Sequence, residues 1–168
     1  IPNARYELPG NGDLSLQRRT FGGVDRTWSD AEFSRMLSCA AKAGREDYIA
    51  ILHLARFAGL RIHECFRIDT ATAAKAVKEK AITIKGKGGL IRTVPLSERL
   101  VNYLQFHLEQ TRRGHKLFVP DAQQTHEAIK ELQVFIWLNR SLAQDEDSTR
   151  PMTFHGLRHT CAAEKYQG

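Results

Sequence analysis

Cysteine is scarce in this sequence of 168 residues, and the scarcity argues against two classes of protein. The three cysteines are Cys39, Cys65 and Cys161, an odd number without a CxxC pair. Neither a disulfide framework nor a four-cysteine zinc site is therefore supported. Unpaired thiols are typical of a reducing compartment, so we expect a cytoplasmic protein.

Long apolar runs are also missing. No stretch approaches the ~18 uninterrupted apolar residues of a membrane span, and the best run, 48–60, is broken by His53 and Arg56. The chain opens Ile-Pro-Asn, without the basic start and apolar core of a signal peptide. We therefore expect no membrane partner. Because no initiator methionine is present, we expect the sequence to be part of a longer protein.

Positive charge is in excess and is unevenly distributed. The sequence has 25 lysines and arginines against 19 acidic residues, a net charge of +6. Between positions 67 and 92 the acidic residues are only Asp69 and Glu79, against the basic Arg67, Lys75, Lys78, Lys80, Lys85, Lys87 and Arg92. Such a basic stripe suits a polyanion such as nucleic acid. Charge alone fits a solvated surface about equally well.

Periodicity predicts a mainly helical α+β domain. Residues 1–27 contain Pro2 and Pro9 with no sustained period and are interpreted as a linker or arm. Ser29 and Glu32 form a capping-box pattern at the start of the first helix. Alternating β-branched residues around a glycine-rich turn predict one antiparallel hairpin. The expected helices cover about 29–43, 46–58, 60–68, 97–113, 123–143 and 153 onward, with 70–80 leaning helical; the expected strands cover 81–85, 90–94 and 116–119.

The first candidate motif is Gly-Leu-Arg-Ile-His-Glu at 59–64. Arg61 and Glu64 are three residues apart, so on a helix they share a face. One interpretation is a surface ion pair worth ~0–1 kcal/mol. The other is a guanidinium that a carboxylate holds in orientation to bind a phosphate through two parallel hydrogen bonds.

The second motif is the turn Lys-Gly-Lys-Gly-Gly at 85–89. It is not a Walker loop, because GxxxxGK[ST] is absent. One interpretation is a flexible hairpin tip that happens to be basic. The other is a mobile ribbon that reaches a DNA groove, where the ammonium of Lys87 could donate a proton to an oxygen leaving phosphorus.

The third motif is Thr-Phe-His-Gly-Leu-Arg-His-Thr at 153–160. His155 and Arg158 are three apart and emerge together from a helix, a combination that suits a phosphoryl oxyanion and its proton transfers. Alternatively, His155 caps the helix and Arg158 bridges to the acidic loop before it. His155 and His159 are also four apart, but no glutamate follows His155, so the HExxH zinc pattern is not met.

Taken together, the three motifs resemble the catalytic domain of tyrosine recombinases, the phage-integrase family. The resemblance extends from Trp28 to the end and implies that family's fold, with helices around a small antiparallel sheet and a basic hairpin. It implies that Arg61, His155 and Arg158 grip the scissile DNA phosphate. It also implies that Lys87, with Lys85 as the fallback, protonates the leaving 5′ oxygen.

The resemblance also implies supporting residues and partners. Glu64 is expected to support Arg61, and His159 to have a packing role. Lys85, Lys87 and Arg92 are expected to contact double-stranded DNA. Other recombinase protomers are expected partners, and no metal, cofactor or small-molecule substrate is implied. In its general character the sequence resembles integrases of bacterial mobile elements.

The family's nucleophilic tyrosine, which forms a 3′-phosphotyrosine intermediate, has no match here. Tyr166 is too close to Arg158 in sequence. We therefore expect the nucleophile beyond residue 168, a catalytic domain over 28–168 that is incomplete at its C-terminus, and no strand cleavage by this chain alone. The competing hypotheses are a DNA-binding module without a catalytic parent and a metal-dependent nuclease that uses His155 and His159.

Overall fold

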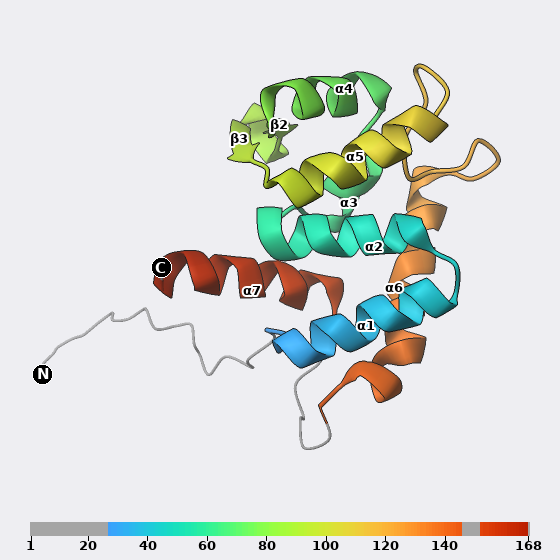
Figure 1. The fold of residues 1–168 in the computed structure, drawn as a ribbon, viewed down its shortest axis with the longest axis vertical. Helices are drawn as coiled ribbons and strands as arrows, with labels where there is room; N and C mark the ends of the chain where they lie inside the picture. The colour runs from blue at the N-terminus through green and yellow to red at the C-terminus, as the bar shows by residue number, and fades with distance from the viewer. Residues whose placement is uncertain (1–26, 146–151, 168) are drawn as a thin grey trace, which may run out of the picture.

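The computed structural model describes residues 27–145 and 152–167, which form a helical domain with one β-hairpin. Figure 1 shows the helices packed side by side, with α6 running across the direction of α1 and α2. The expected mainly helical fold is confirmed, whereas residues 1–26 of the expected arm lie outside the described ranges. In chain order the elements are α1 (Asp30–Lys42), α2 (Glu46–His53), η1 (Leu54–Ala58), α3 (Ile62–Phe66), α4 (Thr70–Glu79), β2 (Ala81–Lys85), η2 (Lys87–Gly89), β3 (Ile91–Pro95), α5 (Glu98–Gln110), α6 (Thr125–Ala143) and α7 (Phe154–Gln167).

Side-chain caps fix where several helices begin. The Ser29 hydroxyl accepts from the amide of Glu32 at 3.1 Å, and the Glu32 carboxylate accepts from the amide of Ser29 at 2.8 Å, which confirms the predicted capping box. Asp69 accepts from the amide of Thr72 at 2.8 Å at the start of α4. The ambiguous segment 70–80 is helical from Thr70 to Glu79, and this cap satisfies one open N–H group of its first turn.

The core lies where the helices meet. α1 packs on α6, α4 on α5, and α7 on η1. The side chains of Leu52, Leu104 and Leu132, from three different helices, are completely buried there. Burial of each such side chain stabilises the fold by ~1.5–3 kcal/mol. The core therefore fixes α7, which is last in the sequence, against the first half of the chain.

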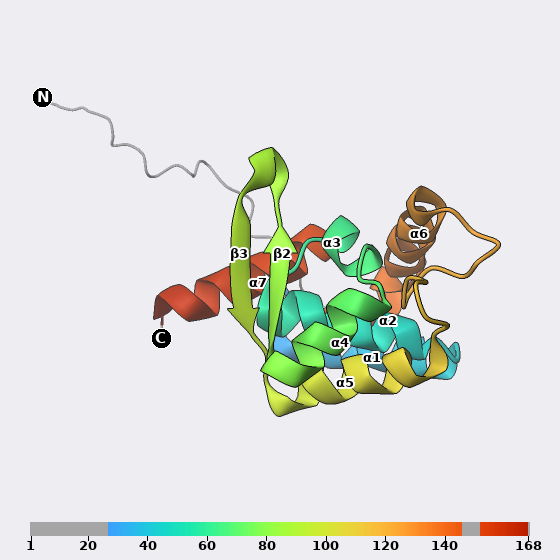
Figure 2. The same cartoon turned by 90° about the horizontal axis from the view of Figure 1, so that it is seen from above.

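The hairpin formed by β2 and β3 stands clear of the helices at its tip (Figure 2). Its antiparallel register pairs Thr83 with Thr93 and Lys85 with Ile91. Ile82 and Ile84 alternate with outward-facing residues and pack toward the core, as period-2 patterning requires. The turn projects beyond the domain, since Leu90 and Ile91 are exposed.

Two element predictions need correction. The expected strand at 116–119 is wrong: Lys116 forms only an isolated bridge with Asp69. Since Asp69 caps α4, the partner backbone turns into that helix and a longer ladder cannot continue. The helix expected to reach Arg113 ends at Gln110, because Thr111 adopts an extended conformation.

Two further observations concern the predicted exclusions. Cys39, Cys65 and Cys161 are all free, as expected. Among helices within 27–145 and 152–167, none combines the length and hydrophobicity of a membrane span.

Candidate functional site

Arg61 lies between two helices, where the backbone turns sharply. Gly59 ends η1 with φ of +72°, a left-handed conformation that glycine adopts without strain. Arg61 is then extended and immediately precedes α3, and its amide donates to Glu64 Oε1 at 2.8 Å. The Arg61 side chain is half-buried, and within the described residues it forms no ion pair. An uncompensated, partly buried guanidinium is suited to an external anion.

Glu64 pairs with Arg92 instead of with the guanidinium of Arg61. Arg92 Nη1 and Nη2 donate to the two carboxylate oxygens of Glu64 at 3.0 and 2.8 Å. The Glu64 side chain is 1% exposed and that of Arg92 is 38% exposed. Burial raises the pKa of the Glu64 carboxyl, but the hydrogen bonds from Arg92 and from the Arg61 amide outweigh it, so the pKa lies below its ordinary value.

This arrangement differs from both interpretations of the first motif, because the Glu64 carboxylate contacts the amide of Arg61 and not its guanidinium. The carboxylate supports the position of Arg61 through the backbone, since it accepts the Arg61 amide. The guanidinium of Arg92, on the hairpin, is engaged by Glu64 of α3, and a contact between Arg92 and DNA stays a prediction.

α7 places Arg158 beside the same loop. Arg158 Nε donates to the carbonyl oxygen of Gly59 at 2.8 Å, two residues before Arg61 in the chain. Burial lowers the pKa of Arg158, and so do the positive charges of Arg61 and Arg92. Arg158 thus contacts a backbone carbonyl, whereas residues 146–151 of the acidic loop considered as its partner lie outside the described residues. Three guanidiniums share one region around a single carboxylate, so the site has positive charge available for an anion.

A cavity of about 490 Å³ lies between α3, α6 and α7. Its walls include three of the four predicted catalytic residues, Arg61, His155 and Arg158. Residues from distant parts of the chain therefore converge on one space large enough for a ligand.

The cavity also contains residues that sequence reasoning missed. His63 lines it from α3, and Gln133 and Trp137 line it from α6. Burial lowers the pKa of His63, and the charge of Arg67 lowers it further. Trp137 is 60% exposed, and the guanidinium of Arg140 stacks on its ring, 3.4 Å from the ring centroid. The signal for His63 was present in the first motif, whereas no local pattern pointed to the two α6 residues.

His155 and His159 lie edge to face on α7, with ring centroids 4.4 Å apart. Both side chains are exposed. Only His155 lines the cavity, in keeping with different roles for the two imidazoles. The part of the chain that the structure describes contains no group of three or more His, Cys, Asp or Glu residues placed to hold a metal ion.

The hairpin carries the two candidate lysines. Lys85 ends β2 and is exposed, beside a smaller cavity of about 200 Å³ that Glu64 and Arg67 also line. Lys87 begins the short turn η2. The side chain of Lys87 lies outside what the structure describes, so its role stays a prediction, and the same holds for the side chain of Tyr166.

Solved structures that match this fold include those of tyrosine recombinases and integrases. The XerA recombinase matches with a TM-score of 0.63 at 20% identity, over 84% of this chain and 50% of that chain. The integrase from mycobacterium phage Brujita matches with a TM-score of 0.59 at 26% identity, over 84% and 44%. A lambda integrase dimer bound to a COC′ core site matches with a TM-score of 0.62 at 15% identity, over 88% and 55%. This chain thus spans about half the length of each of these proteins.

The fold is therefore that of a tyrosine-recombinase catalytic core. A family comparison leads to the same class, because the model described as "Phage integrase family" matches residues 28–167. This chain belongs to the phage integrase family. A comparison with curated protein sequences finds no match.

Proposed function

We propose that this chain is the phosphate-gripping part of a site-specific recombinase that acts on double-stranded DNA. The observation that carries the proposal is the convergence of Arg61, His155 and Arg158 on one cavity. The lambda integrase relative, described as a dimer bound to a COC′ core site, supports DNA as the partner and other protomers as neighbours. The free cysteines are consistent with action in the cytoplasm.

The chemistry follows from the charges. A phosphodiester carries a negative charge that repels nucleophiles, and attack on phosphorus gathers further charge on the non-bridging oxygens. Arg61 and Arg158 would neutralise these oxygens and so stabilise the transition state. His155, beside them in the cavity, would donate a hydrogen bond to one oxygen or shuttle a proton.

Two steps depend on groups beyond this site. The Lys87 ammonium is proposed to protonate the 5′ oxygen as its bond to phosphorus breaks, with Lys85 as the alternative donor. A tyrosine outside this sequence is proposed to attack phosphorus and form the 3′-phosphotyrosine link, which keeps the phosphate activated for rejoining. We therefore expect that this chain alone forms no covalent adduct with DNA.

The claim that the arginines of the cavity bind DNA phosphate can be tested by the salt dependence of DNA binding. The chain is titrated with a random-sequence duplex of about 20 base pairs, and the logarithm of the binding constant is plotted against that of the salt concentration. Each lost phosphate contact changes the slope by ~0.9. We expect Arg61→Gln and Arg158→Gln each to reduce the steepness of the slope by the amount that corresponds to about one phosphate contact. Arg112→Gln removes an exposed arginine outside this cavity and should leave the slope unchanged.

An unchanged slope in both cavity variants would contradict the proposed role of the two arginines. If both cavity variants keep the slope of the parent sequence, the two arginines do not bind backbone phosphate. In the full-length parent, Arg158→Ala is expected to abolish recombination while the fold persists. A full-length parent that binds DNA but gives no covalent tyrosine adduct with a nicked suicide duplex would point instead to a binding module without catalysis.

A further inference from the structure

Two hydrogen bonds from Trp28 hold α7. The backbone N–H of Trp28 donates to Thr160 Oγ1 at 2.8 Å, and its indole N–H donates to the carbonyl oxygen of Thr153 at 2.9 Å. The first bond spans 132 residues of sequence. Trp28 and Thr160 are both buried. Because water cannot readily replace a partner at a buried site, loss of the Thr160 hydroxyl leaves the backbone N–H of Trp28 unsatisfied.

The two sides of α7 have different neighbours. Thr160 and Arg158 are two positions apart, which is about 200° around a helix, so their side chains leave α7 on roughly opposite sides. Trp28 holds the side of Thr160, whose hydroxyl also donates to the Gly156 carbonyl at 3.1 Å. Gly59 holds the other side, through the hydrogen bond from Arg158. These contacts fix the rotation of α7 about its own axis.

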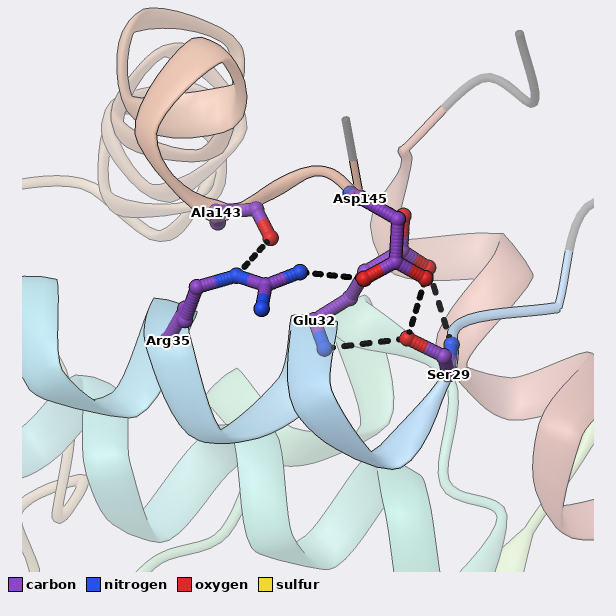
Figure 3. A network of polar contacts seen from close by, with 5 residues as sticks. All are labelled: Ser29, Glu32, Arg35, Ala143 and Asp145. Carbon is purple, nitrogen blue, oxygen red and sulfur yellow. Dashed lines mark hydrogen bonds and ion pairs between the residues drawn. The ribbon is translucent and has the colours of Figure 1, made fainter. Parts of the chain in front are cut away.

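The same turn of the chain holds the end of α6. Ser29 Oγ donates to Asp145 Oδ2 at 2.8 Å, and the buried Glu32 accepts from the Asp145 amide at 3.1 Å. Arg35 Nε donates to the Ala143 carbonyl at 2.7 Å, and the Arg35 guanidinium also pairs with Asp145. Figure 3 shows these side chains converging on Ala143, the last residue of α6, and on Asp145, which follows the helix.

The start of α1 therefore joins two walls of the cavity. α6 supplies Gln133 and Trp137 to that cavity, and α7 supplies His155 and Arg158. Residues 28–35 contact α7 through Trp28 and the end of α6 through the Asp145 network. Because these contacts lie outside the cavity apart from the Thr153 carbonyl, their influence on the site would pass through the placement of the two helices.

We propose that Trp28 and Thr160 are positioning residues, which set α7 so that His155 and Arg158 face one phosphate. The proposal rests on the proposed function of the cavity. It assigns the Thr160 hydroxyl a role in phosphate binding in addition to its contribution to the stability of the fold. Loss of the hydroxyl allows α7 to turn or shift, and the guanidinium of Arg158 then no longer shares an anion with that of Arg61.

The test measures how tightly this chain binds inorganic phosphate. The imidazole NMR signals of His155 and His159 report binding, and a melting curve reports stability. Thr160→Val removes the hydroxyl and keeps the shape, whereas Thr160→Ser keeps the hydroxyl. Ser97→Ala is the matched control, because it removes a different hydroxyl, the one that caps α5, away from the cavity.

We expect Thr160→Val to raise the dissociation constant for phosphate at least fivefold. Thr160→Ser and Ser97→Ala should stay within twofold of the parent sequence. Trp28→Phe keeps an aromatic ring and loses the bond to Thr153, so it should weaken phosphate binding as well. If Thr160→Val does not fold, phosphate binding by Trp28→Phe tests the positioning proposal in its place.

The outcomes separate the two claims. If phosphate moves neither imidazole signal, or if Arg158→Gln binds phosphate as the parent does, the proposed phosphate site fails and the positioning proposal fails with it. If Arg158→Gln abolishes binding but Thr160→Val and Trp28→Phe bind normally, only the positioning proposal is wrong. The positioning proposal is also wrong if Ser97→Ala, at an equal loss in melting temperature, weakens binding as much as Thr160→Val.

Discussion

Both terminal nitrogens of Arg92 donate to the carboxylate of Glu64, at 3.0 and 2.8 Å, across 28 residues of sequence. Arg92 belongs to the hairpin, and Glu64 belongs to α3, which directly follows Arg61. The pair therefore links the ribbon that carries Lys85 and Lys87 to the helix that follows the cavity arginine. Since the amide of Arg61 also donates to Glu64, one buried carboxylate fixes both parts of the proposed site.

Replacement of this carboxylate should destabilise the domain. We expect Glu64→Gln to lower the free energy of unfolding by about 2–3 kcal/mol, because it removes the charge from hydrogen bonds that Arg92 and the Arg61 amide make to a buried group. Urea denaturation measures the change. Glu109→Gln, at an exposed position on α5, is the control and should change stability by no more than about 0.5 kcal/mol. Equal effects at the two positions would contradict the structural role of the pair.

The contribution of Glu64 should also depend on pH. Its folded-state pKa is lowered from an ordinary value of 4.5, so the folded state favours the ionised form. The stabilisation is therefore present above pH 4.5 and is lost as the pH falls through the lower, folded-state pKa. We expect the stability difference between the parent chain and Glu64→Gln to be constant near neutral pH and to shrink in acid. Urea midpoints at several pH values measure it, and a difference that grew in acid would have the wrong sign.

The sharp turn before Arg61 should require glycine. Gly59 has φ of +72°, and a Cβ there would lie 3.5 Å from Cys161 Sγ, an ordinary contact. Backbone strain, and not a steric clash, should therefore determine how much Gly59→Ala lowers the free energy of unfolding, by about 1–2 kcal/mol. Gly44→Ala is the matched control, because it has the same φ and no atom within 4 Å of the added Cβ. Thermal unfolding should show similar losses at the two sites, and a much larger loss at Gly59 would implicate packing instead.

The hairpin lysine should matter for chemistry more than for binding. In the full-length parent, we expect Lys87→Ala to slow DNA cleavage by roughly 10²–10⁴-fold, as for the loss of a general acid. DNA affinity should change by only a few-fold. A substrate with sulfur in place of the leaving 5′ oxygen should restore the rate, because a thiolate leaves without protonation. Lys85→Ala is the control, and if it shows the same rescuable defect while Lys87→Ala does not, Lys85 is the proton donor.

Local patterns were enough to predict most of the elements. The capping box at Ser29 and Glu32 placed the start of α1, and alternating residues placed the hairpin, because caps and strand alternation involve neighbours in sequence. The false strand at 116–119 shows where this reasoning stops. A strand exists only if a partner backbone remains extended beside it, and the segment after Asp69 is helical.

The sequence by itself determined the class of elements, the three motifs and, through their order, the family to which the chain belongs. Hydrogen bonding and periodicity within a few residues fix such features. Only the tertiary structure decided that Glu64 pairs with Arg92, that Trp28 holds α7, and that α6 supplies Trp137 to the cavity. Those contacts join residues far apart in the chain, and they form only when the packed core brings their helices together.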